Sequence, residues 1–152
     1  MRGFHISNND LDIKKASFNQ NVIQVFSQPP QSFTIPKDIK KLTFPSEIKQ
    51  VFTHAIYTIN FTKDKIDERT IKSIGHDLEF LKNISDDRGI GTIIHAGSSD
   101  CKTCYINVMN HLIEITNRYS TGMVLIENMA VAGNKLFPTI ANGTSFEYLS
   151  IT

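Results

Sequence analysis

The stretch that decides the fold is residues 91–98 (GTIIHAGS), in which a β-branched apolar run ends at His95 and a small, polar turn follows. Buried parallel strands have this composition, and their carboxyl ends carry the functional residues of α/β folds. The same pattern occurs twice more, since QVFTH ends at His54 and MVLIE ends at Glu127. Three strand ends therefore present two imidazoles and a carboxylate, a common ligand set for zinc.

Strands and helices are predicted to alternate outward from this stretch. The predicted strands are residues 3–7, 22–26, 50–54, 92–95 and 124–127. The predicted helices are residues 10–19, 64–82 (at most to 86), 98 or 99 to 118, and the start of one at 146. Such alternation predicts a parallel α/β sheet with right-handed crossovers. The pattern suits a barrel and a doubly wound sheet equally, because both place functional residues at the carboxyl ends of strands.

Two of these helices carry apolar stripes that predict which face is buried. The helix that Asp64 is expected to cap has its stripe at Ile71, Ile74, Leu78 and Leu81. The helix after residue 98 is expected to turn Ile106, Met109 and Ile113 toward the core, with Leu112 beside them. The helical histidines, His76 and His111, are expected at the surface.

Composition predicts one soluble domain over residues 1–152, with 40% hydrophobic and 20% charged residues. The formal net charge of +1 does not by itself indicate a nucleic-acid partner. No apolar run approaches the 18 residues or so of a membrane span, and two cysteines are too few for a disulfide framework. We therefore expect an intracellular protein of a reducing compartment. Cys101 and Cys104 have redox-motif spacing, but two cysteines in one helical turn are the favoured interpretation.

Five motifs, in order along the chain, resemble the endonuclease IV family of zinc-dependent apurinic/apyrimidinic endonucleases. GFHIS at 3–7 resembles the first strand of the family, and VF at 25–26, before a polar loop and Phe33, resembles the second. HAIYTIN at 54–60 is similar to His-x-Ser-Tyr-x-Ile-Asn, and HAGS at 95–98 is similar to His-Pro-Gly-Ser. IEN at 126–128, with AG at 132–133, resembles Glu-Asn-Thr-Ala-Gly.

This resemblance implies a parallel β/α TIM barrel and metal-assisted hydrolysis of the phosphodiester 5′ of an abasic site in DNA. By position in the motifs, His54 and His95 would bind one zinc, and Glu127 would bridge it to a second and act in catalysis. Tyr57 and Asn60 would lie near the DNA or hold the His54 loop. Gln31, in the loop after the second strand, would take the place of the DNA contacts of the family.

The chain also departs from the family, most of all in length. Ile56 stands at the signature serine and Ala96 at the proline. A full (β/α)8 barrel takes roughly 250 residues, so we expect about five strands, a truncated half barrel. Three outcomes are then open: a fragment of a longer product, a half that a second copy or a partner chain completes, or a sheet that flattens into a three-layer sandwich. The remaining zinc ligands of the family would be absent, and we expect weak cleavage or none. The alternative is a barrel remnant without catalytic activity that serves as a structural or interaction module.

The strand-end residues also have interpretations that need no metal. His54 and His95 could be histidines whose hydrogen bonds are satisfied at a polar strand end. A carboxylate at a buried strand end needs a partner, so Glu127 would then pair with an arginine or lysine.

Overall fold

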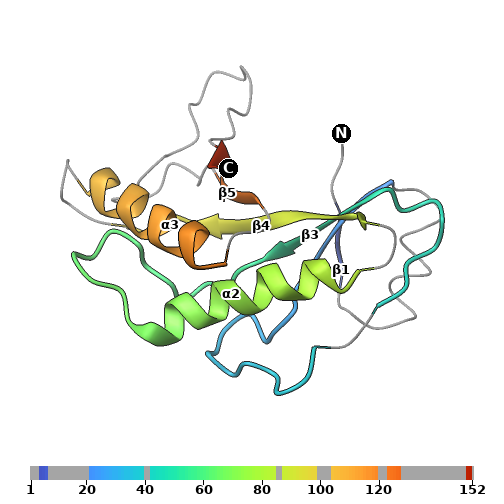
Figure 1. Ribbon diagram of the computed structural model, residues 1–152, viewed down its shortest axis with the longest axis horizontal. Coiled ribbons are helices and arrows are strands. Elements are labelled where there is room, and N and C mark those ends of the chain that lie inside the picture. The colour runs from blue at the N-terminus through green and yellow to red at the C-terminus, as the bar shows by residue number, and fades with distance from the viewer. Residues whose placement is uncertain are drawn as a thin grey trace.

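The computed structural model describes residues 4–6, 21–39, 42–84, 87–98, 104–119, 123–127 and 150–151, with the backbone alone for the first and last of these ranges. One sheet holds six strands in the order β1-β2-β3-β4-β5-β6. The strands are β1 (Phe4–Ile6), β2 (Val22–Val25), β3 (Gln50–His54), β4 (Gly89–His95), β5 (Met123–Glu127) and β6 (Ser150–Ile151). The helices are α2 (Glu68–Lys82) and α3 (Tyr105–Tyr119), which lie on the same face of the sheet (Figure 1).

Strands β1 to β5 are all parallel, and each pairs with the next strand along the chain. A doubly wound sheet would reverse its strand order at a switch point, whereas a barrel continues in one direction. The sequential order is therefore that of a β/α barrel segment, and the predicted α/β half barrel of about five strands is confirmed. The helix predicted for residues 10–19 lies outside the described residues.

The end of the chain differs from the prediction of a helix from residue 146 onward. Residues 146–149 lie outside the described part of the chain, but Ser150–Ile151 form β6, which pairs antiparallel with β5 at Val124 and Leu125. Extended backbone at this edge satisfies β5 groups that a helix would leave without a partner. The single antiparallel strand is therefore an addition to the barrel segment.

The two faces of the sheet differ in burial because side chains alternate along each strand. The face that the helices cover carries side chains that are fully buried or nearly so, namely Val51, Thr53, Thr92, Ile94, Val124 and Ile126. On the opposite face, which corresponds to the inside of a barrel, Phe52, Ile93 and Met123 are only partly buried. His54, His95 and Glu127 share the alternation of this inner face.

Helix α2 confirms the predicted stripe but begins later than expected. Ile71, Ile74, Leu78 and Leu81 are all buried. The N-cap is Asp67, whose side chain accepts the Thr70 amide hydrogen bond at 2.9 Å. Asp64, the predicted cap, lies before the helix and accepts a hydrogen bond of 3.0 Å from Asn107 of α3.

Helix α3 turns a different face to the core from the one predicted. Its buried residues are Val108, His111, Leu112 and Ile115, whereas Ile106 and Ile113 are 47% and 46% exposed. The two stripes lie about 100° or more apart on the helix, and tertiary packing selected the one that includes Leu112. The predicted surface position of His111 and His76 is also wrong, because both are buried. Neither helix in the described part of the chain is long and apolar enough to cross a membrane.

Candidate metal centre

Adjacent parallel strands bring three side chains of the inner face to one end of the sheet. His95 and Glu127 are register partners on β4 and β5. His54, the last residue of β3, pairs with Ile93, which lies two residues before His95 and therefore on the same face. Because all three residues end their strands, their side chains meet at the carboxyl end of the sheet, where barrel folds carry their active sites.

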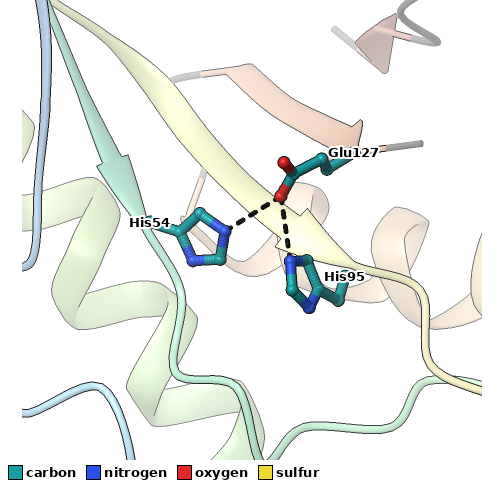
Figure 2. A group of neighbouring side chains, drawn as sticks. All are labelled: His54, His95 and Glu127. Carbon is teal, nitrogen blue, oxygen red and sulfur yellow. Dashed lines mark hydrogen bonds and ion pairs between the residues drawn. The ribbon is translucent and has the colours of Figure 1, made fainter. Parts of the chain in front are cut away.

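The three side chains converge on one oxygen of Glu127, as Figure 2 shows. The Nε2 atom of His54 lies 3.1 Å from Glu127 Oε2, and the Nε2 atom of His95 lies 2.9 Å from the same oxygen. One ligand atom from each residue lies within 4.8 Å of the other two. The chain therefore gathers two imidazole nitrogens and a carboxylate oxygen from strand ends 41 and 32 residues apart.

The contacts of His54 show why this donor set suits a cation. Its Nδ1 lies 2.7 Å from the Ala55 carbonyl oxygen, while its Nε2 faces the Glu127 carboxylate. A neutral imidazole has one N–H, so two oxygen acceptors on opposite sides require either a second proton or a cation next to Nε2. A backbone carbonyl at Nδ1 is also the usual partner that orients a metal-binding histidine. The residues present therefore fit a zinc ion.

Glu127 supplies the negative charge of the site. Hydrogen bonds from His54 and His95 lower the pKa of this carboxyl from 4.5 to about 2, against the effect of partial burial. The Glu127 side chain is 47% exposed and that of His95 is 25% exposed, whereas that of His54 is 4% exposed. Glu127 thus stays ionised at neutral pH, and the cluster opens to solvent on the Glu127 side.

Aromatic rings surround the histidines. The Tyr57 ring centre lies 5.1 Å from that of His54 and 5.4 Å from that of His95, and Phe26 packs edge-on against His54 at 5.5 Å. Partial burial and, to a smaller extent, the Glu127 charge raise the pKa of Tyr57, so its hydroxyl stays protonated. Phe26, the residue that follows β2, was not predicted at the site. The strand-end rule that selected the histidines applies to it equally, but an apolar side chain gave no chemical signal.

Asn60 ties the loop after β3 to the loop after β4. Its Nδ2 donates to the Ser98 carbonyl at 3.1 Å, and its Oδ1 accepts from the Thr62 amide and hydroxyl. Gly97, at φ 104°, lies so close that a Cβ atom there would be 2.1 Å from Asn60 Oδ1. Asn60 therefore links the two loops, and its contact with DNA stays a prediction.

The loop after β2 also reaches the site. The Pro30 carbonyl accepts a hydrogen bond of 2.8 Å from the Tyr57 amide. Gln31, the next residue, is exposed, so its side chain is available to a partner near Tyr57. Binding of DNA by Gln31 and Tyr57 stays a prediction.

Comparison with known proteins finds likeness in structure but not in sequence. No protein-family model matches the chain, and no curated protein sequence matches it. Among solved structures, endonuclease IV from Thermus thermophilus is similar, with a TM-score of 0.63 and 20% identity over 89% of this chain. This chain spans 54% of the length of that structure. The protein therefore has the fold of an endonuclease IV-like domain of about half length.

Proposed function

We propose that this protein binds one zinc ion through His54, His95 and Glu127, and that the site serves an endonuclease IV-like reaction, hydrolysis of the phosphodiester 5′ of abasic sites in DNA. The observation that carries the proposal is the convergence of the three ligand atoms, which come from the ends of three consecutive parallel strands. The fold likeness to an endonuclease IV and the order of the five sequence motifs support the choice of reaction.

The residues of the site divide the work between binding and positioning. His54, fixed through Nδ1 by the Ala55 carbonyl, offers Nε2 in one orientation, and His95 and Glu127 complete the ligand set. Bound zinc would supply Lewis-acid polarisation of a phosphodiester oxygen and neutralise developing negative charge. Tyr57 and Gln31, at the rim of the site, would contact the nucleic acid. An abasic nucleotide has no base to unstack, so turning it into such a site costs little.

We expect the 152-residue chain alone to bind metal but to cleave DNA weakly or not at all. The described residues offer one cluster of three ligands, whereas the family resemblance implies a centre with further zinc ions. A second copy or a partner chain that completes the barrel would provide the opposite wall of the site. The molar mass in solution, from light scattering, tests this part of the proposal.

Metal binding is the largest effect we predict. Zinc content by mass spectrometry and affinity by calorimetry should give about one zinc per chain. Substituting His54→Ala or His95→Ala removes one of three protein ligands, and we expect the affinity to fall by at least about 100-fold, since even a lost hydrogen-bond partner of a ligand costs 10- to 100-fold. His111→Gln, which removes a histidine whose contact is the Lys63 carbonyl, should bind zinc as the wild type does.

Three results would each contradict a different part of the proposal. If the wild-type protein binds no zinc at saturating zinc concentrations, the metal site is excluded and the structural module is favoured. Robust cutting of an abasic duplex by the 152-residue chain, abolished by a chelator, would overturn the expectation of weak activity but support the assignment of the reaction. Zinc binding together with no activity in any assembly would leave a binding module and contradict the assigned hydrolysis.

A further inference from the structure

A second polar cluster lies behind the site, between helix α2 and the sheet. Asp77 of α2 is fully buried. Its Oδ1 accepts hydrogen bonds from the Ser27 hydroxyl and from Gln28 Nε2, the latter at 3.2 Å. Gln28 also donates to the Ser73 carbonyl at 3.0 Å, and the Ser73 hydroxyl donates to Gln28 Oε1 at 3.1 Å. The loop after β2 is therefore bound to α2 through the Asp77 carboxyl.

The second oxygen of Asp77 shows which protonation state fits this place. Asp77 Oδ2 is buried and has no hydrogen-bond partner in the described part of the chain, and the same holds for the hydroxyls of Thr53 and Thr92. The Thr92 hydroxyl lies near the carboxyl. In the described part of the chain no cation faces this fully buried carboxyl, and an unpaired buried carboxylate is costly. The Ser27, Gln28 and Thr92 side chains favour the charged form, but desolvation outweighs them. Burial raises the pKa of Asp77 from 3.8 to about 7.

The loop that Asp77 holds forms part of the wall of the candidate metal centre. Phe26, which precedes Ser27, packs against the rings of both His54 and Tyr57 at 5.5 Å. Pro30, on the same loop, accepts the Tyr57 amide hydrogen bond, and the exposed Gln31 follows it. Movement of Ser27 and Gln28 away from α2 would therefore shift the aromatic wall without touching the three ligand residues.

We propose that Asp77 is a positioning residue: in its protonated form it holds the loop of residues 26–32 beside the candidate site, and its ionisation releases that loop. The side chains that face it from the loop, from β4 and from α2 (Ser27, Gln28, Thr92 and Ser73) are uncharged. The neighbouring titratable group is His76, whose pKa burial lowers below 6.5. The inference holds whether or not the centre binds zinc.

Amide hydrogen exchange across pH tests this inference in the chelator-treated 152-residue chain. An open loop with Asp77 in water would have a carboxyl pKa near 3.9. The equilibrium constant for opening of the loop should therefore rise about tenfold per pH unit between pH 5 and 7 and level off above pH 7. We expect the protection factors of the Ser27, Gln28, Gln31, Ser32 and Tyr57 amides to fall accordingly, while those of α3 stay constant.

Asp77→Asn is the decisive variant, because its amide accepts at Oδ1 and donates from Nδ2 as the protonated acid does, but cannot ionise. We expect loop protection close to that of wild type at pH 5, with no decline up to pH 7. The same pH profile in both proteins would overturn the role of ionisation. Loss of loop protection in Asp77→Asn at pH 5 would overturn the assignment of the protonated form.

Gln28→Ala tests the positioning role separately, because it removes a contact to Asp77 Oδ1 and leaves the carboxyl in place. We expect lower loop protection at every pH with the wild-type slope retained. Unchanged protection of the Gln31, Ser32 and Tyr57 amides would show that the cluster does not hold the loop, and would overturn the proposal.

Discussion

The two faces of this sheet are built from the same strands but differ in burial and in chemistry. On the face that α2 and α3 cover, residues such as Val51, Ile94 and Val124 are inaccessible to solvent. On the inner face, Phe52 and Ile93 are partly exposed, and the strands end in the metal-ligand candidates. Helices provide the hydrophobic partner that one face of a sheet needs. The face without such a partner is where charged and metal-binding groups can reach solvent.

Asp77, on the helix-covered side of the sheet, and Glu127, on the inner face, differ in burial in the same way. Asp77 lies in a fully buried cluster, and desolvation raises its pKa to about 7. Glu127 is half-exposed between two imidazoles, and their hydrogen bonds lower its pKa to about 2. Desolvation dominates at Asp77, which is fully buried and faces uncharged donors, and hydrogen bonding dominates at Glu127, which is half-exposed. The helix-covered face therefore favours a neutral acid and the inner face a permanent anion.

Neighbouring isoleucines of β4 provide the largest expected contrast in stability between the faces. Ile94→Ala should lower the free energy of unfolding by about 2–5 kcal/mol, because it leaves a cavity under the helices. Ile93→Ala, one residue earlier on the inner face, should cost about 1 kcal/mol or less, because its side chain is already partly hydrated. Urea denaturation of both variants measures the difference. Equal losses would mean that the inner face is covered in solution, as a second copy or a partner chain would cover it.

The pH dependence of stability should differ in sign between the two carboxyls. The folded protein binds the Asp77 proton more tightly than the unfolded chain, so the free energy of unfolding should fall as pH rises from about 4 to 7, by about 1.4 kcal/mol per pH unit at most. Glu127 binds its proton less tightly when folded, so its contribution is present above about pH 4.5 and is lost as pH falls toward 2.

Denaturation across pH in the presence of a chelator separates these contributions. Asp77→Asn should remove the decline between pH 4 and 7, and Glu127→Gln should reduce the loss of stability below pH 4.5. The Glu127 effect should weaken in high salt, because this side chain is half-exposed. A decline between pH 4 and 7 that persists in Asp77→Asn would contradict the assigned pKa of that carboxyl.

A smaller effect than that of Ile94→Ala is expected in the loops that join the inner face to the site. Gly97→Ala places a Cβ atom against Asn60 Oδ1 at a positive φ, and we expect a loss of about 1–3 kcal/mol. Asn60→Ala/Gly97→Ala removes the two closest contacts, those with Oδ1 and Cγ, and leaves the backbone strain and the Asn60 Cα atom at 3.1 Å. The double variant should therefore lose less than the sum of the single variants. Thermal unfolding measures all three. Strict additivity would mean that the two residues do not contact each other.

The α3 stripe shows why part of the fold could not be read from the sequence. Ile106, Met109 and Ile113 have helical spacing, and so do Val108, Leu112 and Ile115. Two apolar stripes on one helix satisfy the same periodicity, and only packing against β4, β5 and α2 selects one. Similarly, Asp64 and Asp67 are both good helix caps. Asp64 instead binds Asn107 of α3, a residue 43 positions away.

The amino-acid sequence by itself determined the alternation of strands and helices and the choice of His54, His95 and Glu127, because apolar runs that end in polar groups follow from local chemistry. Only the tertiary structure decided that the two imidazoles meet one oxygen of Glu127 and that Phe26 and Tyr57 pack against the histidines. It also decided that Asp77 is buried behind them. Such contacts join residues tens of positions apart, and the register of parallel strands, which no local pattern encodes, sets which of them meet.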